Sequence, residues 1–320
     1  MLDVITIGNA TLDVFVHVHP RVFRGNICFL PGSKVEAEAV DFFTGGGAGN
    51  VAVGLSRLGL KTGIIAVLGS DQSSKIIVDE LKGEKVSTAL ISFSKKNSTP
   101  YSVILTGFHR DRIVLTYSGA VKELATGKPI KFSRLDSKWL YVSSFHSPPN
   151  ILKKIFSHAR EKGIKTAYNP GTQELKSGRQ KFSGIAKGID VLLMNSSEAL
   201  MLTGSADIGR NLHVLSEIAK IAVITDGPHG VHAADGNYMY FKNAFDVEVL
   251  DTTGAGDAFN AGFIAALIQG KPVEEAIDWG TANSNSVIQY LGTKNILLSK
   301  AGIKKFLSKY KSNRTTKMKI

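Results

Sequence analysis

The sequence predicts an α/β protein in which a doubly wound, mostly parallel sheet carries a small inserted β-sheet lid. Short apolar strands alternate with amphipathic helices along most of the chain, which is the pattern of repeated βα units. Two segments interrupt this alternation with antiparallel strand patterns. The 320 residues are 43% hydrophobic and 21% charged, the usage of a packed globular protein rather than of a disordered chain.

The first predicted strand opens the chain. Residues 3–8 place Val4, Ile5 and Ile7 before a glycine, as in a buried strand that ends in a turn. Similar apolar runs, separated by helical patterns, recur through the chain and imply parallel strands with helices on both faces of the sheet. The remaining strands are expected at 61–68, 139–142, 165–168, 191–194 and 221–225, and the helices at 52–58, 151–159, 251–270 and 273–291.

The two interrupting segments predict a lid. In the second of them, residues 101–105 and 113–117 have strand character and flank the polar turn 107–111, which predicts a hairpin. The first segment supplies enough strand-like material to complete a small separate sheet. The chain then divides into a body at 1–13, 45–96 and 119–310, a lid at 14–44 and 97–118, and a basic tail at 311–320.

The formal net charge of +12 raises the question of a nucleic-acid partner. Much of this charge lies in dispersed lysines and in the basic segment between Lys304 and Lys319. No RNA- or DNA-binding motif accompanies it, and aromatic residues are not interleaved in a stacking pattern. We therefore expect a solvated basic surface with some attraction for phosphorylated ligands, and no nucleic-acid partner.

The cellular context follows from the cysteine content and the apolar runs. Cys28 is the only cysteine, so an intramolecular disulfide and a zinc site built from several thiolates are excluded. The sequence has neither an N-terminal signal pattern nor a run of ~18 apolar residues. We expect a cytoplasmic protein without a membrane partner.

A turn of small residues precedes the predicted helix at 251–270. Gly254, Ala255 and Gly256 would expose backbone N–H groups at the positive end of this helix, where an anion is favoured and a phosphate can approach closely. Asp257 follows directly and could accept a proton from a substrate hydroxyl. A plain helix-capping aspartate after a flexible glycine turn would give the same local pattern.

A second glycine cluster, G-G-G-A-G-N at residues 45–50, leads into the predicted helix at 52–58. Alone it is weak, because glycine-rich turns before helices are common and this one lacks the dinucleotide-binding spacing. Residues 54–62 approach a phosphate-loop pattern, but with one residue too many and in the order helix then strand. That segment is therefore not a phosphate loop.

Taken together, the two glycine blocks resemble the two signatures of the PfkB/ribokinase family of sugar and nucleoside kinases. Matching residues continue beyond each block, as Ala52, Val53, Arg57, Leu58 and Gly59 after the first and Ala258, Phe259, Ala261 and Gly262 after the second. The resemblance implies a ribokinase-like three-layer α/β/α sandwich with a small β-sheet lid. It also implies transfer of the γ-phosphate of MgATP to a hydroxyl of a sugar, most readily a primary hydroxymethyl group.

The resemblance assigns roles to the second block. Asp257 would be the general base, and Gly254, Ala255 and Gly256 would form a backbone anion hole for the transferring phosphate. Asp251 and the backbone of Thr253 resemble the monovalent-cation site, for K⁺, that many members of the family have.

Three further groups of residues match the nucleotide side of the family. Asn195 and Glu198, in N-S-S-E, match the motif that organises Mg²⁺ and phosphate through water, although the same residues would also form a helix capping box. The family's nucleotide loop corresponds to Thr225, Gly227 and Gly230, and its asparagine near the adenine corresponds to Asn283.

On the acceptor side, Asp13 and Asn50 match positions that hydrogen-bond sugar hydroxyls, and Gly45 and Gly46 accompany them in the first block. Such polar groups suit the task because an unpaired hydroxyl in a closed site costs ~1–3 kcal/mol. His146 is a departure, since ribokinases carry a glutamate there that contacts the sugar. This substitution argues against ribose itself as the acceptor.

Two alternatives to a sugar kinase stay open at this stage. A nucleoside acceptor would need an aromatic or apolar floor, for which Phe15, Phe42, Phe108 and Phe145 are candidates. A catalytically inactive, basic nucleic-acid-binding protein is the alternative from another class. Exposed lid strands could also pair two copies into a homodimer.

Overall fold

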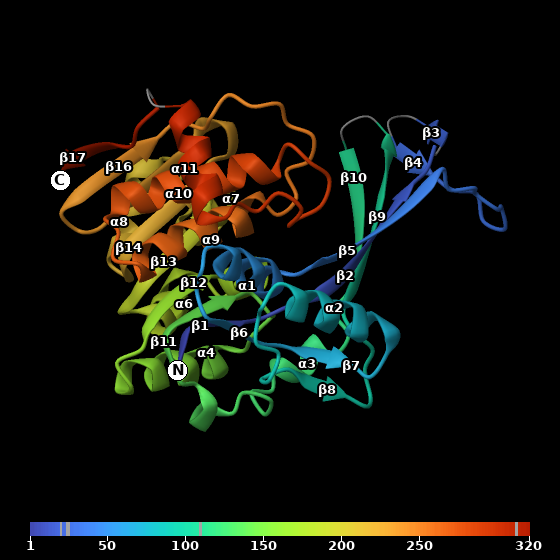
Figure 1. Ribbon diagram of the computed structural model, residues 1–320, viewed down its shortest axis with the longest axis horizontal. Helices are drawn as coiled ribbons and strands as arrows, with labels where there is room; N and C mark the ends of the chain where they lie inside the picture. The colour runs from blue at the N-terminus through green and yellow to red at the C-terminus, as the bar shows by residue number, and fades with distance from the viewer. Residues whose placement is uncertain (20, 24–25, 109–110, 311–312) are drawn as a thin grey trace.

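The computed structural model describes residues 1–19, 21–23, 26–108, 111–310 and 313–320. Within these residues a nine-stranded sheet forms the centre of the molecule (Figure 1). Its strands, in spatial order, are β17 (Thr316–Lys319), β16 (Tyr238–Lys242), β15 (Val231–Ala234), β14 (Ala219–Thr225), β13 (Ile189–Asn195), β12 (Lys165–Asn169), β11 (Ser137–Ser143), β1 (Leu2–Ile7) and β6 (Thr62–Ile65).

The strands from β14 to β6 are parallel to their neighbours, and β15, β16 and β17 continue the sheet in antiparallel fashion. Because parallel strands end on the same side, the carboxyl ends of β1, β11, β12, β13 and β14 meet at one edge. Loops that leave these ends can therefore build one shared site.

Helices cover both faces of the sheet, and alternate side chains of each strand enter two separate cores. In β11, for example, Leu140 and Val142 join one core whereas Trp139 and Tyr141 join the other. The first core packs against α3 (Val121–Leu124), α4 (Pro149–Glu161), α5 (Thr172–Leu175), α6 (Arg179–Ala186), α7 (Ser196–Thr203) and α8 (Ile208–Ser216). The second packs against α1 (Gly47–Arg57), α9 (Ala255–Ile268), α10 (Val273–Val287) and α11 (Lys300–Lys309).

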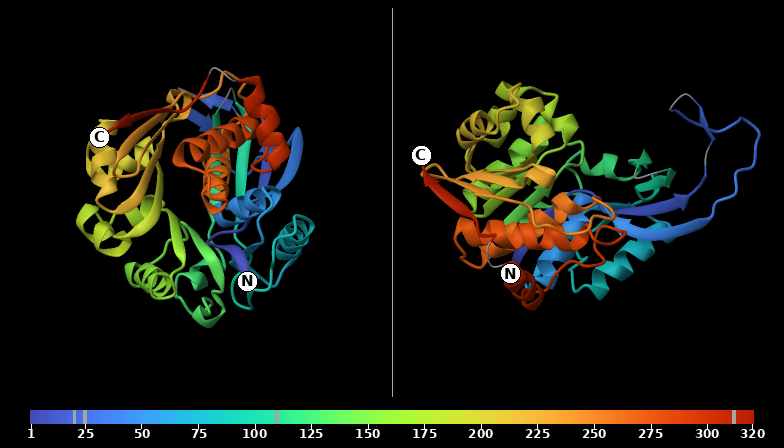
Figure 2. Two further views of the ribbon diagram at one scale, coloured as in Figure 1. Left: turned by 60° about the vertical axis from the view of Figure 1, so that its left-hand side comes forward. Right: turned by 90° about the horizontal axis from the view of Figure 1, so that it is seen from above.

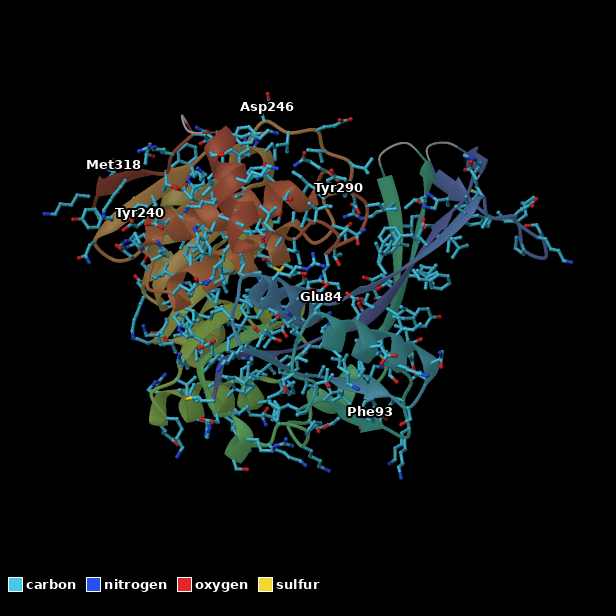
Figure 3. The ribbon with its side chains drawn as sticks, in the orientation of Figure 1. Glu84, Phe93, Tyr240, Asp246, Tyr290 and Met318 are labelled. Carbon is cyan, nitrogen blue, oxygen red and sulfur yellow. The ribbon has the colours of Figure 1, made fainter. Side chains whose placement is uncertain are left out.

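Side chains fill the space between these layers (Figure 3). In that view Met318, on β17, lies at the left of the body, and Phe93, on β8 (Ser92–Ser94), lies at its lower edge. Three layers of helix, sheet and helix therefore form one body. The two remaining short helices within the described ranges are η1 (Phe132–Arg134) and η2 (Gly227–His229).

The lid is a separate four-stranded sheet that projects from the body (Figures 1 and 2). Its order is β10 (Asp111–Tyr117), β9 (Tyr101–Phe108), β2 (Thr11–His17) and β5 (Ala39–Gly45). β9 and β10 form the expected antiparallel hairpin, whose turn residues His109 and Arg110 lie outside the described residues. The division of the chain into body, lid and tail at particular residues stays a proposal.

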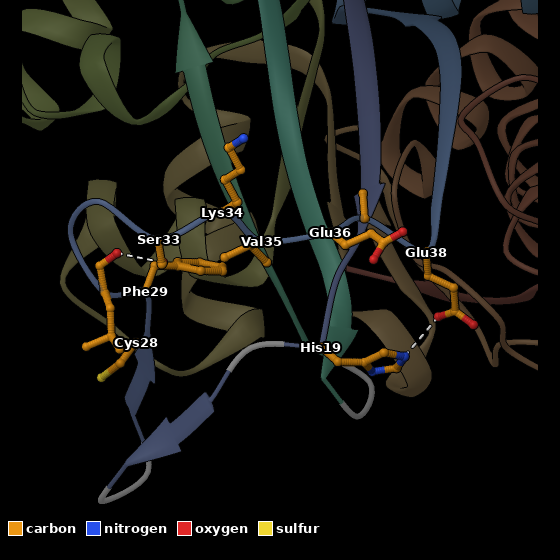
Figure 4. Close-up of a pocket in the computed structure, with 10 residues that line it drawn as sticks. His19, Cys28, Phe29, Ser33, Lys34, Val35, Glu36 and Glu38 are labelled. Atoms are coloured by element: carbon orange, nitrogen blue, oxygen red, sulfur yellow. Dashed lines mark hydrogen bonds and ion pairs between the residues drawn. The ribbon is translucent and has the colours of Figure 1, made fainter.

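An arm extends the lid between β2 and β5 and carries the short strands β3 (Arg21–Phe23) and β4 (Asn26–Cys28). A hollow of about 610 Å³ lies in this arm, lined by residues of 19–38 that include His19, Lys34 and Glu38 (Figure 4). His19 Nε2 lies 2.9 Å from Glu38 Oε2. The hollow contains none of the predicted site residues.

Most predicted elements are confirmed, with five differences. The helix expected at 52–58 is α1, which begins at Gly47 and includes part of the glycine cluster. The strand expected at 61–68 is two strands, because β1 ends at Ile7 and β7 (Val67–Gly69) then pairs with β8 instead. The helix expected from 251 begins at Ala255, since Gly254 takes a left-handed conformation, and the helix expected to reach 291 ends at Val287. Part of the basic tail forms β17 at the edge of the main sheet.

The remaining helix, α2 (Gln72–Gly83), packs beside the base of the lid at β2 and β5. None of the helices in the described ranges is long and apolar enough to span a membrane.

Candidate active site

A cavity of about 320 Å³ lies between the lid and the carboxyl edge of the main sheet. Body and lid both contribute to its wall, so the lid completes the site. Seven of the predicted site residues line this cavity, and they come from segments that are far apart in the sequence. They are Asp13, Gly46, Asn50, His146, Thr253, Gly254 and Asp257, and Ser102 and Thr293 join them in the wall.

Asp257 lies in the first turn of α9 at the floor of this cavity. Its Oδ2 accepts a hydrogen bond of 2.7 Å from Asn50 Nδ2. A Cβ added to Gly47 would lie 2.8 Å from Ser143 Oγ but 3.5 Å from Oδ1 of Asp257, so the close packing at Gly47 is against Ser143 and Oδ1 keeps ordinary contact distance. Burial raises the pKa of Asp257 and nearby Asp13 adds to the rise, whereas the bond from Asn50 and the charge of Lys294 lower it.

The turn before α9 presents backbone donors to the same region. Gly254 is the N-cap residue with φ +80°, and a Cβ there would lie 2.8 Å from Thr293 Cβ, so glycine is required on both counts. The N–H of Ala255 donates to Thr252 O at 3.2 Å. Among the described residues no partner is found for the N–H groups of Gly256 and Asp257, which can therefore receive an anion at the positive helix end.

Asp13 reaches the cavity from the lid strand β2. Burial raises the pKa of Asp13, while hydrogen bonds from Ser102 and Thr11 lower it. A Cβ added to Gly45 would lie only 1.9 Å from Asp13 Oδ2. Gly45 therefore makes room for this carboxylate, and Gly46, the N-cap of α1 with φ +86°, turns the chain beside it.

His146 lines the cavity in the loop that follows β11, and its φ of +56° lies in the left-handed region, which is unusual for a residue other than glycine. The buried carboxylate of Glu174 holds this loop. It accepts hydrogen bonds from Ser144 Oγ at 2.8 Å and from the backbone N–H of Ser147 at 3.0 Å. The side chain of His146 is thus presented by a braced loop rather than by a free one.

Asn195 and Glu198 begin α7 at the end of β13, and they form the expected capping box. Asn195 Oδ1 accepts from the N–H of Glu198 at 2.8 Å, and Glu198 Oε2 accepts from the N–H of Asn195 at 2.9 Å. Burial raises the pKa of Glu198 to about 7, and the carboxylates of Asp257 and Glu174 add to the rise. Glu198 therefore senses the charge of Asp257 as well as capping a helix.

A second, narrower cavity of about 100 Å³ lies on the other side of the α9 N-terminus. It is lined by Thr225, Gly227 and Gly230 of the predicted nucleotide loop and by Ala255 and Gly256. The turn before α9 therefore separates the two cavities and borders both.

Asn283 does not line this second cavity. Its amide is fully buried, donates to Ala258 O at 2.7 Å and accepts from the N–H of Leu298 at 2.8 Å. Ser284 and Asn285, from the same helix, line the cavity instead. In this structure the amide of Asn283 joins α10 to its neighbours, next in sequence to the residues that line the pocket, and its role near the adenine stays a prediction.

Asp251 and Thr253 form a tight turn before α9. Asp251 Oδ1 accepts from the N–H of Thr253 at 2.9 Å and from Arg112 Nη1, which reaches across from the lid, at 3.0 Å. Asp251 Oδ2 is buried and has no hydrogen-bond partner among the described residues. A buried carboxylate oxygen without a partner fits a bound cation.

Sequence reasoning missed two buried residues, Thr293 and Lys294, in the loop between α10 and α11. Thr293 Oγ1 lies 3.0 Å from Asn50 Oδ1, and Lys294 Nζ lies 2.9 Å from Glu80 Oε1 of α2. No motif flags either residue, because an isolated threonine and lysine in a loop are common. Lys294 is unusual because its side chain is only 7% exposed, and lysines are seldom so buried. The sequence does not show this burial.

The aromatic candidates for a nucleoside floor are not gathered at the cavity. Phe15 and Phe145 are buried in the protein, and Phe42 is 63% exposed on β5. The side chain of Phe108 lies outside the described residues. Of these candidates, Phe15 shares the face of the lid sheet that carries Asp13, where it packs edge to face against Phe43 and where Val114 also lies.

Comparison with known proteins places this geometry in a family. A cytidine kinase of Thermococcus kodakarensis is 27% identical over 306 residues, which cover 92% of this chain and 99% of that protein. Among solved structures, a nucleoside kinase of Methanocaldococcus jannaschii superposes with a TM-score of 0.81 at 21% identity, covering 97% of this chain and 99% of that one. The ribokinase of Arabidopsis thaliana, solved with ribose and ATP, gives 0.79 at 19% identity, covering 96% and 98%.

Because both solved structures are less than 25% identical to this chain, their similarity is evidence for the fold only. It confirms the predicted ribokinase-like sandwich with its separate small sheet. The family itself follows from the sequence match. Residues 1–300 match the family described as pfkB family carbohydrate kinase. Because that match spans nearly the whole chain and includes both cavities, the chain belongs to the pfkB family of carbohydrate kinases.

Proposed function

We propose that this protein transfers the γ-phosphate of MgATP to a hydroxyl of a sugar, with Asp257 as the general base. One observation carries the proposal: a carboxylate stands at the N-terminus of α9, where backbone N–H groups that have no partner within the described ranges border both cavities. The larger cavity would hold the acceptor and the narrower one the nucleotide.

Asp257 would remove the acceptor proton through Oδ1, because Oδ2 is engaged by Asn50. Its raised pKa makes it a stronger base than an exposed aspartate. The N–H groups of Gly256 and Asp257 would stabilise the charge that spreads over the phosphate oxygens. Asp13 would orient the acceptor by accepting hydrogen bonds from its other hydroxyls.

ATP, when bound with Mg²⁺, supplies the phosphoryl group. Thr225, Gly227 and Gly230 would hold the nucleotide, and Glu198, with Asn195, would organise the metal ion through water. Two observations support this assignment. The side chain of Glu198 is partly exposed, and it lies close enough to Asp257 for the charge of that carboxylate to raise its pKa. The unpartnered Oδ2 of Asp251 supports a K⁺ site beside the anion hole, with Thr253 as a neighbour.

A nucleoside is the second candidate acceptor. The lid face that carries Asp13 continues into the apolar residues Phe43 and Val114, and Val114 is 47% exposed. An exposed apolar platform beside a hydroxyl-binding carboxylate suits a ligand with a sugar at one end and a base at the other. The 27% identity with a cytidine kinase agrees with this candidate.

An ADP-release assay tests the proposal. The intact protein is presented with MgATP and with pentoses, hexoses, sugar phosphates or nucleosides, each with and without K⁺. We expect ADP release that depends on one acceptor class. A protein that binds ATP yet turns over no acceptor, and that loses affinity for nucleic acid steeply with salt, would instead support the inactive nucleic-acid-binding alternative.

We further propose a homodimer formed through the outer face of the lid. Val40, Phe42 and Leu115 lie on the face opposite Asp13 and are 46%, 63% and 56% exposed. Analytical ultracentrifugation should give a dimer that Phe42→Glu with Leu115→Glu converts to a monomer. A monomeric parent protein would contradict the proposal. The cytoplasmic location and the absence of a nucleic-acid partner stay predictions.

A further inference from the structure

Thr293 lies next to three parts of the site: the turn before α9, Asn50 of α1 and the lid strand β5. It is 4% exposed, and it follows Gly292 in the loop between α10 and α11. Its Cβ and Cα pack so closely on Gly254 that a Cβ added to that glycine would lie 2.8 and 2.9 Å from them. Thr293 therefore supports the turn that exposes the backbone N–H groups before α9.

The hydroxyl of Thr293 controls the orientation of Asn50. Thr293 Oγ1 lies 3.0 Å from Asn50 Oδ1, to which it donates, and Asn50 Nδ2 donates in turn to Asp257 Oδ2 at 2.7 Å. An asparagine amide can be turned over, which exchanges its donor and its acceptor. Because the Thr293 hydroxyl donates to the oxygen of this amide, the amide keeps its N–H facing the carboxylate of Asp257. If the amide turned over, its oxygen would face the Asp257 carboxylate, and both groups are acceptors.

The same hydroxyl reaches the lid. Thr293 Oγ1 lies 3.3 Å from the carbonyl oxygen of Thr44, which stands near the end of the lid strand β5. The next residue, Lys294, donates from Nζ to Thr44 Oγ1 and pairs with Glu80 on α2. Because a hydroxyl carries one proton and Asn50 Oδ1 is the nearer acceptor, the tie between this loop and Thr44 comes from Lys294.

The loop is itself braced from the body. Arg57 Nη1, at the end of α1, donates to the carbonyl oxygen of Lys294 at 2.8 Å, and Arg57 pairs with Glu84 at 2.6 Å. Thr293 thus sits on a fixed support between the lid strand and the catalytic aspartate.

We propose that Thr293 is a positioning residue: its hydroxyl orients the amide of Asn50 toward Asp257, in a loop that Lys294 ties to lid strand β5 at Thr44. The inference rests on the proposed function, because it gives Asp257 the role of the base. Thr293 acts through Asn50, so its removal should weaken turnover without abolishing it.

The pKa of Asp257 depends on whether the Asn50 amide is held in this orientation. The charged groups that act on it are Asp13 from the lid, Lys294 from the same loop as Thr293, and Glu198 from α7, and the buried hydroxyl of Tyr141 lies within range of its charge. The bond from Asn50 lowers the pKa of Asp257, and none of those four groups is changed when the hydroxyl of Thr293 is removed. A disordered Asn50 amide should therefore raise the pKa of Asp257.

The test compares Thr293→Val, which keeps the shape and removes the hydroxyl, with Thr293→Ser, which keeps the hydroxyl. Ser286→Ala is the matched control, because it removes a buried hydroxyl that donates to Ile296 O, in the same loop, without touching Asn50. The side-chain carboxyl of Asp257 is titrated by carbon-13 NMR, with its signal assigned through Asp257→Asn. Circular dichroism checks that each variant is folded.

We expect the titration midpoint of Asp257 to rise by about one pH unit in Thr293→Val, and kcat to fall about tenfold, with the acidic limb of the kcat/KM profile moved the same way. Thr293→Ser and Ser286→Ala should match the parent protein. An unchanged midpoint in a folded Thr293→Val variant would overturn the inference. If the parent protein turned over no acceptor, the proposed function would fail, whereas the titration would still decide whether Thr293 positions Asn50.

Discussion

Replacement of Glu198 by glutamine should stabilise the protein at alkaline pH while lowering its activity. A carboxyl whose pKa rises from its ordinary 4.5 to about 7 destabilises the folded state by about 3 kcal/mol once it is ionised. Because Glu198 keeps partial contact with solvent, screening should reduce the measurable part to about 1–2 kcal/mol. Glutamine can still accept the capping bond from Asn195, so the helix start is retained.

The way in which the stability of the folded protein changes with pH follows from proton binding. Between pH 4.5 and 7 the folded protein holds a proton on Glu198 that the unfolded chain has already lost, so stability falls as pH rises through this window. Glu198→Gln removes this dependence, and its advantage over the parent protein should therefore grow by about 1–2 kcal/mol between pH 5 and pH 8.

Urea unfolding of the two proteins at pH 5 and pH 8, in buffer without divalent ions, measures this difference. Glu161→Gln, at the exposed end of α4, is the matched control and should give the same difference at both pH values. A Glu198→Gln advantage that is equal at both pH values, or larger at pH 5, would refute the reasoning.

Three other substitutions probe the walls of the site. Gly45→Ala would place a Cβ 1.9 Å from Asp13 Oδ2, so the carboxylate must move, and the KM for the acceptor should rise about tenfold in steady-state assays; an unchanged KM would contradict the role of Asp13. Glu174→Ala leaves buried donors of Ser144 and Ser147 without an acceptor and should lose about 1–3 kcal/mol in urea unfolding, and a neutral result would count against the bracing of the His146 loop. Gly230→Ala would bring a Cβ to 2.0 Å from Lys242 O at a φ of +97°, so the KM for ATP should rise while that for the acceptor changes little; the opposite pattern would separate this loop from the nucleotide.

The body of the fold was predictable because its signals are local. Apolar runs such as that of β1 identify a buried strand by themselves, and the recurrence of strands and helices then implies the parallel sheet. The division of 61–68 into β6 and β7 was not predictable, since it depends on where the neighbouring strand β1 ends. β17 was missed for a similar reason, because a lysine-rich segment becomes a strand only through pairing with the edge strand β16.

The residues of the candidate site likewise fall into those that a local sequence pattern identifies and those that it does not. Residues within the two glycine blocks could be found, because turns and helix starts require particular residues at fixed spacing. The match at Asn283 does not by itself show which residues of α10 line the narrower cavity, since the sequence alone does not say which side of this helix faces it. Thr293 and Arg112 lie outside any local pattern, because each gains its role from a long-range contact, to Asn50 and to Asp251 respectively.

The turnover of Asp257→Asn tests the central claim most directly. The substitution keeps the shape of the side chain and removes its capacity to accept a proton. With the acceptor found in the ADP-release assay, turnover should fall by ~10²–10⁴ while the affinity for MgATP, measured by calorimetry, stays nearly that of the parent protein. A variant that binds ATP and turns over at close to the parent rate would contradict the assignment of Asp257 as the base.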